Sequence, residues 1–252
     1  MSGSLRKGKT AGTKTAAGQV GHLPNHGGAQ GPGPPPGLPR QRRGVTPQMR
    51  GRYPDYDALA AIEHWDERTR EVVLERVQDV PELRFFDANE ARTLRAFCDV
   101  VTAQDSEPRI PVLEMVDAKL HAGRLDGFRY VDMPPDPETW QRVAASLDRS
   151  AQAEGHEHFA AAPSECQHEL IERFSNGELD WELPVAKAWA VVMRMVLAAF
   201  YSHPWAWSEI GFGGPAYPRG FARLGAGQRE QWEAPPQFEV DPVADVPARG
   251  LE

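Results

Sequence analysis

The side chains best suited to chemistry lie in one stretch, from Glu154 to Glu169, where imidazoles, a thiol and carboxylates follow one another closely. Such a set could hold a transition metal, and the candidate ligands are His156, His158, Cys166 and His168. The spacing argues against a metal site. His156 and His158 lie on either side of an expected helix end, and Cys166 and His168 face different directions on a helix. We expect a solvated helix connection here and keep a free-standing metal-dependent enzyme as the alternative function.

A further histidine, His203, follows a long apolar segment and precedes Pro204. A general base needs an aligned nucleophile, and Ser202 is only its neighbour in the chain. A histidine at the C-terminus of a helix interacts well with the helix dipole, so we expect His203 to cap a helix or to contact a partner. The chain also contains no nucleophile elbow, P-loop, dinucleotide glycine fingerprint or zinc-spaced cysteine pair. These features favour a docking protein over a catalyst.

The segment from residue 200 to residue 221 combines aromatic residues with many glycines and prolines. Glycine and proline interrupt it so often that we expect no regular element. A loop this apolar should lie against a surface, either that of its own domain or that of a partner. Glu209 and Arg219 either pair with each other or reach a partner. The predicted partner interface consists of His203, Trp205, Trp207, Glu209, Phe212, Tyr217 and Arg219.

Apolar residues recur at helical spacing in most of the chain, and almost nothing alternates as a strand does. The expected helices span residues 57–78, 88–103, 111–122, 138–153, 164–176 and 184–202. Asp87 and Glu90 have the spacing of a capping box at the second helix, and Gly177 is placed to end the fifth. The pattern predicts an all-α protein with a single domain of about six helices.

The sixth of these helices, residues 184–202, is apolar in nearly every direction, and its exceptions are Lys187 and Arg194. A helix that is apolar all round is typically buried, so we expect it to be the central buried helix of the domain. An unpaired buried charge is costly. Each of the two cations should therefore meet a carboxylate, either on a neighbouring helix or on a partner.

Charge is distributed unevenly over the 252 residues. Residues 1–52 contain nine Lys and Arg and no acid, so all 36 acidic residues lie in the remainder. We expect a disordered, basic, Gly/Pro-rich tail at 1–52, a helical domain at 53–232 and a loose, Pro-rich, acidic tail at 233–252. The acidic domain argues against a nucleic-acid partner. A weaker alternative is a scaffold whose basic tail binds anionic surfaces.

Targeting signals and cysteines give little information about the location of the protein. Arg42 and Arg43 are not followed by the apolar segment of a twin-arginine signal, and the apolar run at 185–201 is a poor membrane span. We expect no transmembrane segment and a cytoplasmic location, or a periplasmic or membrane-associated one if the chain is exported with a partner. Cys98 and Cys166 do not make a disulfide framework.

The run from Tyr201 to Pro215, YSHPWAWSEIGFGGP, resembles the gluconate 2-dehydrogenase subunit 3 family, with support from residues 85–94 and 112–120. The resemblance spans about residues 80–222. It implies a small helical subunit, without a cofactor of its own, that binds and stabilises or matures an FAD-dependent catalytic subunit of the glucose-methanol-choline (GMC) type. It implies FAD in the partner, a cytochrome c subunit in some complexes, and no catalytic residue in this chain.

Overall fold

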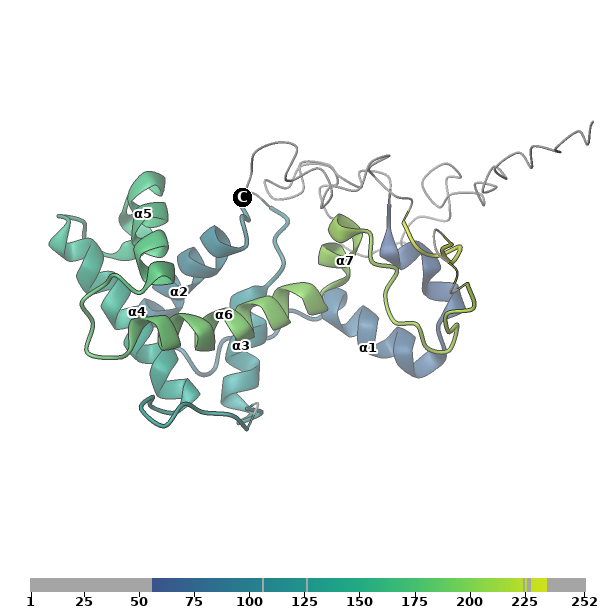
Figure 1. Cartoon of the computed structure of the whole chain (residues 1–252), viewed down its shortest axis with the longest axis horizontal. Coiled ribbons are helices and arrows are strands. Elements are labelled where there is room, and N and C mark those ends of the chain that lie inside the picture. The colour runs from purple at the N-terminus through teal and green to yellow at the C-terminus, as the bar shows by residue number, and fades with distance from the viewer. Residues whose placement is uncertain (1–55, 106, 126, 224, 226–227, 235–252) are drawn as a thin grey trace, which may run out of the picture.

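The computed structural model describes residues 56–105, 107–125, 127–223, 225 and 228–234. The predicted tail at 1–52, and all but two residues of the one at 233–252, lie outside these residues. The described residues form helices and no strand, which confirms the all-α prediction (Figure 1). The elements are η1 (Ala58–His64), α1 (Glu67–Gln78), α2 (Ala88–Val101), α3 (Val112–His121), α4 (Asp136–Ala153), η2 (Phe159–Ala161), α5 (Ser164–Asn176), α6 (Val185–Ser202) and α7 (Pro204–Ile210).

Two helix termini follow the sequence signals closely. At α2, the Asp87 carboxylate accepts hydrogen bonds from the backbone of Asn89 and Glu90, and the Glu90 carboxylate accepts one from the backbone of Asp87. This is the predicted capping box. At α5, Gly177 ends the helix with a φ of 74°, the left-handed conformation that glycine adopts without strain.

The prediction of one helix over residues 57–78 is wrong. A 3-10 helix, η1, ends at His64, and α1 begins only at Glu67. The Asp66 carboxylate accepts a hydrogen bond from the Thr69 backbone and so starts a new helix, because aspartate competes well for such backbone donors. The break also lets Trp65, which is only 3% exposed, turn into the interior.

The expectation of no regular element between residues 200 and 221 is also wrong, because α7 lies there. Pro204 occupies the first turn of α7, where a missing N–H costs nothing. Gly211 ends the helix with a φ of 71°. The prolines and glycines that seemed to exclude a helix therefore mark its two ends.

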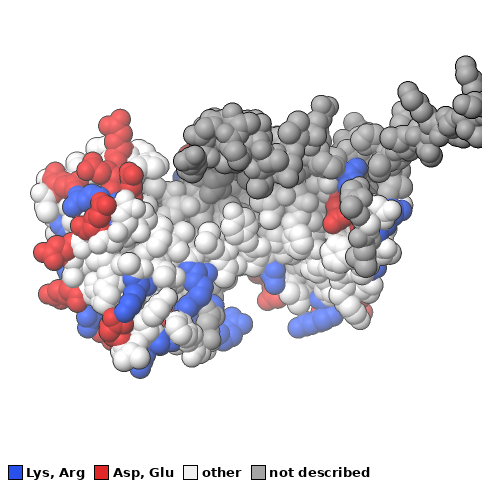
Figure 2. Space-filling model, viewed as in Figure 1, with Lys and Arg blue, Asp and Glu red and all other residues white. Residues whose placement is uncertain are grey.

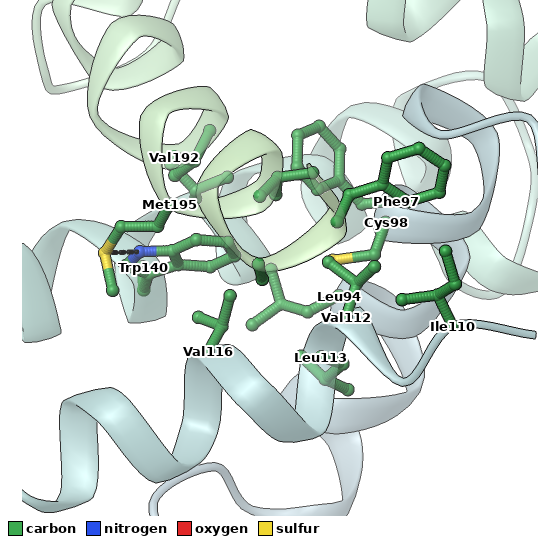
Figure 3. Close-up of a cluster of buried hydrophobic side chains, with 14 of the residues drawn as sticks. Leu94, Phe97, Cys98, Ile110, Val112, Leu113, Val116, Trp140, Val192 and Met195 are labelled. Atoms are coloured by element: carbon green, nitrogen blue, oxygen red, sulfur yellow. Dashed lines mark hydrogen bonds between the residues drawn. The ribbon is translucent and has the colours of Figure 1, made fainter. Parts of the chain in front are cut away.

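The main part of the molecule, called the body here, consists of α2 to α6, with α6 packed against α3, α4 and α5. Figure 3 shows its interior, where side chains of α2, α3, α4 and α6 meet. Trp140 of α4 is fully buried and its Nε1 donates a hydrogen bond to Sδ of Met195 on α6 at 3.2 Å. The body is thus organised around α6, as the sequence predicts.

A second cluster, called the aromatic lobe here, consists of η1, α1, α7 and the described residues among 211–234. In Figure 1, α6 runs from the body towards this lobe, which lies at the opposite end of the molecule. The lobe joins segments far apart in the chain: Tyr56 donates a hydrogen bond to the Trp232 carbonyl at 2.6 Å, and the Ala58 N–H donates one to Ser208 Oγ at 3.1 Å. The tryptophans of the aromatic segment at residues 200–221, Trp205 and Trp207, are buried in this lobe.

Candidate partner-binding site

His203 lies at the junction between α6 and α7 and is only 1% exposed. Its Nδ1 accepts a hydrogen bond from the Trp205 N–H at 3.2 Å, and so caps the N-terminus of α7. Burial, with a contribution from the nearby charge of Arg76, lowers the pKa of His203 to about 4. The ring is therefore neutral near pH 7. It caps a helix as an acceptor, and not as the cation at a helix C-terminus that the sequence suggested.

The two tryptophans predicted at the interface, Trp205 and Trp207, are 7% and 4% exposed. Trp207 Nε1 donates to the Tyr201 carbonyl at 2.7 Å, and its ring meets the edge of Trp65 at a centroid distance of 6.5 Å. Glu209 is buried as well, at 7%. In this structure these side chains contact their own domain and hold the lobe together.

Arg219 occupies the middle of the aromatic lobe. Its Nη2 donates to the carbonyls of Gly213 and Pro215 at 2.7 and 2.8 Å. Its guanidinium lies 4.0 Å from the ring centroid of Trp232 and 5.7 Å from that of Trp65. Burial lowers its pKa, but a guanidinium remains charged near neutral pH. These contacts brace the loop from within the domain, through backbone carbonyls and indole rings.

Two glycines let the indole rings approach the backbone of this segment. A Cβ on Gly213 would lie 2.5 Å from Trp232, and one on Gly214 would lie 2.6 Å from Cζ2 of Trp65. Gly214 also has a φ of 78°, which disfavours other residues. The close packing explains why glycine follows the aromatic residues here.

The remaining two members of the predicted interface are exposed: Phe212 at 43% and Tyr217 at 68%. The Phe212 ring lies edge-on to Trp207 at 5.7 Å between centroids. The structure thus separates the seven predicted residues into five that are buried or half-buried and two that are exposed. The two exposed residues, Phe212 and Tyr217, are available for docking.

An exposed apolar stripe on α6 was missed by the sequence analysis, which predicted a helix buried all round. The residues of this α6 stripe are Ala186, Ala190, Leu197, Ala198 and Tyr201, with the half-buried Met193 between them. Leu197 is 41% exposed and Tyr201 45%. Apolarity on every side of a helix gives no sign of which side is bare, so only the packing reveals the stripe.

The predicted pairing of the two α6 cations is confirmed within the chain itself. Lys187 contacts Asp132 at 2.5 Å, and Arg194 contacts Asp136 at 3.4 Å. Both carboxylates belong to the segment that leads into and begins α4. The prediction allowed these carboxylates to come from the domain or from a partner. Both Asp132 and Asp136 belong to the domain.

The four candidate metal ligands are not gathered around one point. His158 Nδ1 accepts a hydrogen bond from the Ala161 N–H and caps η2, while His168 bonds to Ser164 within α5. Cys166 donates to Glu154 at 3.0 Å, and burial together with that carboxylate raises its pKa to about 11. Among the described residues, no group of three or more His, Cys, Asp or Glu lies close enough to hold a metal ion.

Helix α6 is also the one helix in the described part of the chain that is long and apolar enough to cross a membrane. Of its 18 residues, 44% are buried inside the structure. Core helices of soluble proteins have the same length and composition, so this observation does not identify a span.

The fold and the exposed surfaces define an all-helical domain with an aromatic lobe. A family model described as gluconate 2-dehydrogenase subunit 3 matches residues 88–214, and the chain belongs to this family. The matched segment begins at α2 and ends at Gly214, so it contains α6 and α7 but not η1, α1 or Tyr217. Comparisons with curated proteins and with solved structures gave no match.

Proposed function

We propose that this chain is a non-catalytic accessory subunit that binds and stabilises or matures an FAD-dependent GMC-type dehydrogenase, such as gluconate 2-dehydrogenase. The observation that carries the proposal is the family match over residues 88–214, whose description is that of a subunit of a dehydrogenase. In this proposal the flavin and the redox chemistry belong to the partner. A cytochrome c subunit is a further candidate member of the complex.

The proposed mechanism is thermodynamic. A subunit that binds only the folded catalytic chain favours that folded chain by mass action, by about 2.7 kcal/mol at a concentration of 100 times the dissociation constant. The exposed apolar residues of α6 and α7 support this role, because aromatic and aliphatic anchors contribute much of the binding energy at interfaces. No side chain of this domain needs to take part in catalysis.

The test is purification of the tagged full-length chain from its native cells, with flavin absorbance and mass spectrometry of the product. We expect a yellow complex that contains a second polypeptide with bound flavin. The melting temperature of that polypeptide should rise with the concentration of this chain. A colourless chain that elutes alone would overturn the proposal, and stoichiometric bound metal would favour the metal-dependent alternative instead.

A further inference from the structure

The α6 stripe differs from the rest of α6 because its residues stay exposed among the described residues of the chain. The stripe lies on one face of the helix, because intervals of three and four separate Ala186, Ala190, Met193, Leu197 and Tyr201, and Ala198 adjoins Leu197. The other faces pack against α3, α4, α5 and α7. Exposed apolar residues gathered on one face of a central helix point to a function, since soluble proteins rarely expose large apolar patches without one.

Two cations, Lys187 and Arg194, lie on the same face of α6 as the stripe. Figure 2 shows mostly uncharged surface around the middle of this face of the molecule, with Lys and Arg side chains among it, while Asp and Glu gather at the end formed by α4 and α5. Both cations already contact a carboxylate of the chain, Lys187 that of Asp132 and Arg194 that of Asp136. Because burying an unpaired charge is costly, the surface that covers this stripe should itself be uncharged.

Two further exposed apolar residues lie at the end of α7, Ile210 and Phe212. Trp207 connects the two helices, since its Nε1 bonds to the carbonyl of Tyr201 and its ring contacts Phe212. Phe212 is 43% exposed and Ile210 is 39% exposed. The exposed apolar surface therefore includes the end of α7 as well as the length of α6.

The family match sets a limit on where a shared docking surface can lie. It covers residues 88–214, which include the whole stripe, Ile210 and Phe212, but it ends before Tyr217. If partner binding is the common role of the family, the residues that perform it should belong to the matched segment. This favours the α6 stripe over the exposed loop that follows Gly214.

We propose that the α6 stripe, extended by Ile210 and Phe212, docks an uncharged, apolar helical surface of the flavin-carrying catalytic subunit. The inference rests on the proposed function and adds the surface and the chemistry of its counterpart. The alanines permit close approach of a second helix, because the distance between packed helices depends on the side chains at the contact. Leu197 and Tyr201 supply larger side chains to fill pockets in the partner.

The test introduces a charge into the stripe of the full-length tagged chain. The variants are Leu197→Glu and Ala190→Glu, and the matched control is Val131→Glu, at an exposed apolar position outside the stripe. We expect each stripe variant to reduce the recovered flavin polypeptide at least about tenfold, since a tenfold change needs only 1.4 kcal/mol. The control should recover as much as the unaltered chain, and all variants should keep its circular dichroism and melting temperature.

A photo-crosslinking residue in place of Leu197 identifies the occupant directly. A crosslink to the flavin-carrying polypeptide supports the inference, and the same residue at position 131 should give none. If the unaltered chain binds the flavin polypeptide and the stripe variants bind it equally well, the inference is wrong and the proposed function stands. If the unaltered chain binds no flavin polypeptide, the proposed function itself fails.

Other occupants give different results. Crosslinks between two copies of this chain, with loss of a dimer in the Leu197→Glu variant, would overturn the inference in favour of self-association. Binding to neutral phosphatidylcholine vesicles that the same variant abolishes would overturn it in favour of a membrane surface. A crosslink to residues 1–55 or 235–252 of the same chain would mean that the chain covers its own stripe.

Discussion

His203 shows how a titratable side chain can serve structure alone. Its ring is almost completely buried, it accepts the Trp205 N–H, and it meets the Trp205 ring edge-on at 4.8 Å between centroids. The position at the turn between α6 and α7 requires an acceptor, which only the neutral imidazole provides. Protonation would remove that acceptor and leave a buried charge beside Arg76.

The stability of the protein should therefore depend on pH through His203. Its folded pKa of about 4 lies below the ordinary value of 6.5, so between these values the unfolded chain binds the proton and the folded chain does not. This contribution to stability is complete above pH 6.5 and declines as the pH falls towards 4. The total loss is about 3 kcal/mol.

Urea unfolding of the unaltered chain and of His203→Gln, at a series of pH values from 7 to 4, measures this effect. The stability difference between the two should decrease by about 3 kcal/mol over that range. His121→Gln, at an exposed position, is the control for the loss of a histidine as such. A constant difference between His203→Gln and the unaltered chain would show that His203 does not titrate in this way.

Gly214 makes a second prediction for a single residue, and Gly220 provides its control. Both have positive φ values, 78° and 69°, but a Cβ would meet Trp65 at 2.6 Å in the first and nothing within 4 Å in the second. Gly220→Ala should cost about 1 kcal/mol from the backbone alone. Gly214→Ala should cost a further 1–3 kcal/mol, roughly, from overpacking. Equal losses in urea unfolding would mean that the lobe relaxes around the added methyl group.

At the scale of an element, Asp117 determines how the chain enters α2. This carboxylate of α3 is fully buried and accepts three backbone N–H groups, from Arg84 at 2.8 Å and from Phe85 and Phe86 at 2.9 Å. The capping box at Asp87 follows directly. A buried carboxylate on the apolar face of a helix thus joins two elements that are separated by more than 30 residues.

Asp117→Ala should destabilise the protein by about 3–5 kcal/mol, because three N–H groups would lose their acceptor inside the protein. Asp87→Ala is the matched control, since it removes the same group from two exposed backbone N–H groups that water can reach. We expect the control to cost about 1 kcal/mol. Comparable losses for the two variants in chemical denaturation would contradict the role given to burial.

At the scale of the whole molecule, the body and the aromatic lobe meet at the end of α6. Arg76 of α1 donates a hydrogen bond to the Ser202 carbonyl at 2.6 Å and lies 6.0 Å from the Trp207 ring centroid. Burial lowers its pKa. Helix α1 is part of the lobe, and Ser202 is the last residue of α6. Arg76 is therefore one of the side chains that link the lobe to the body.

Loss of this link should loosen the lobe more than the body. In Arg76→Ala, we expect amide protons of residues 56–78 and 204–234 to exchange about thirtyfold faster, which corresponds to roughly 2 kcal/mol. Exchange in α4 and α5 should not change. The control is Arg68→Ala on the same helix, whose side chain is 80% exposed and should contribute little. Faster exchange throughout the molecule would indicate one cooperative unit instead.

Much of the fold follows from local patterns in the sequence. Helical periodicity predicts the helices of the body, Asp87 with Glu90 predicts the start of α2, and Gly177 predicts the end of α5. These features depend only on residues that are close together in the chain, so the sequence alone shows them. The family resemblance was likewise visible from a contiguous motif, and it is confirmed.

The candidate site depends on contacts that no local pattern contains. The sequence shows that the aromatic segment must lie against an apolar surface, and that α6 is apolar on every side. The packing of η1 and α1 against α7 determines where Trp207 is buried. The packing of α3, α4 and α5 against α6 determines which face of α6 stays exposed. Those contacts join residues as far apart as Ala58 and Ser208. Burial is a property of the assembled structure, so only the tertiary fold distinguishes the tryptophans that hold the lobe together from the α6 stripe, which is exposed in the described part of the chain.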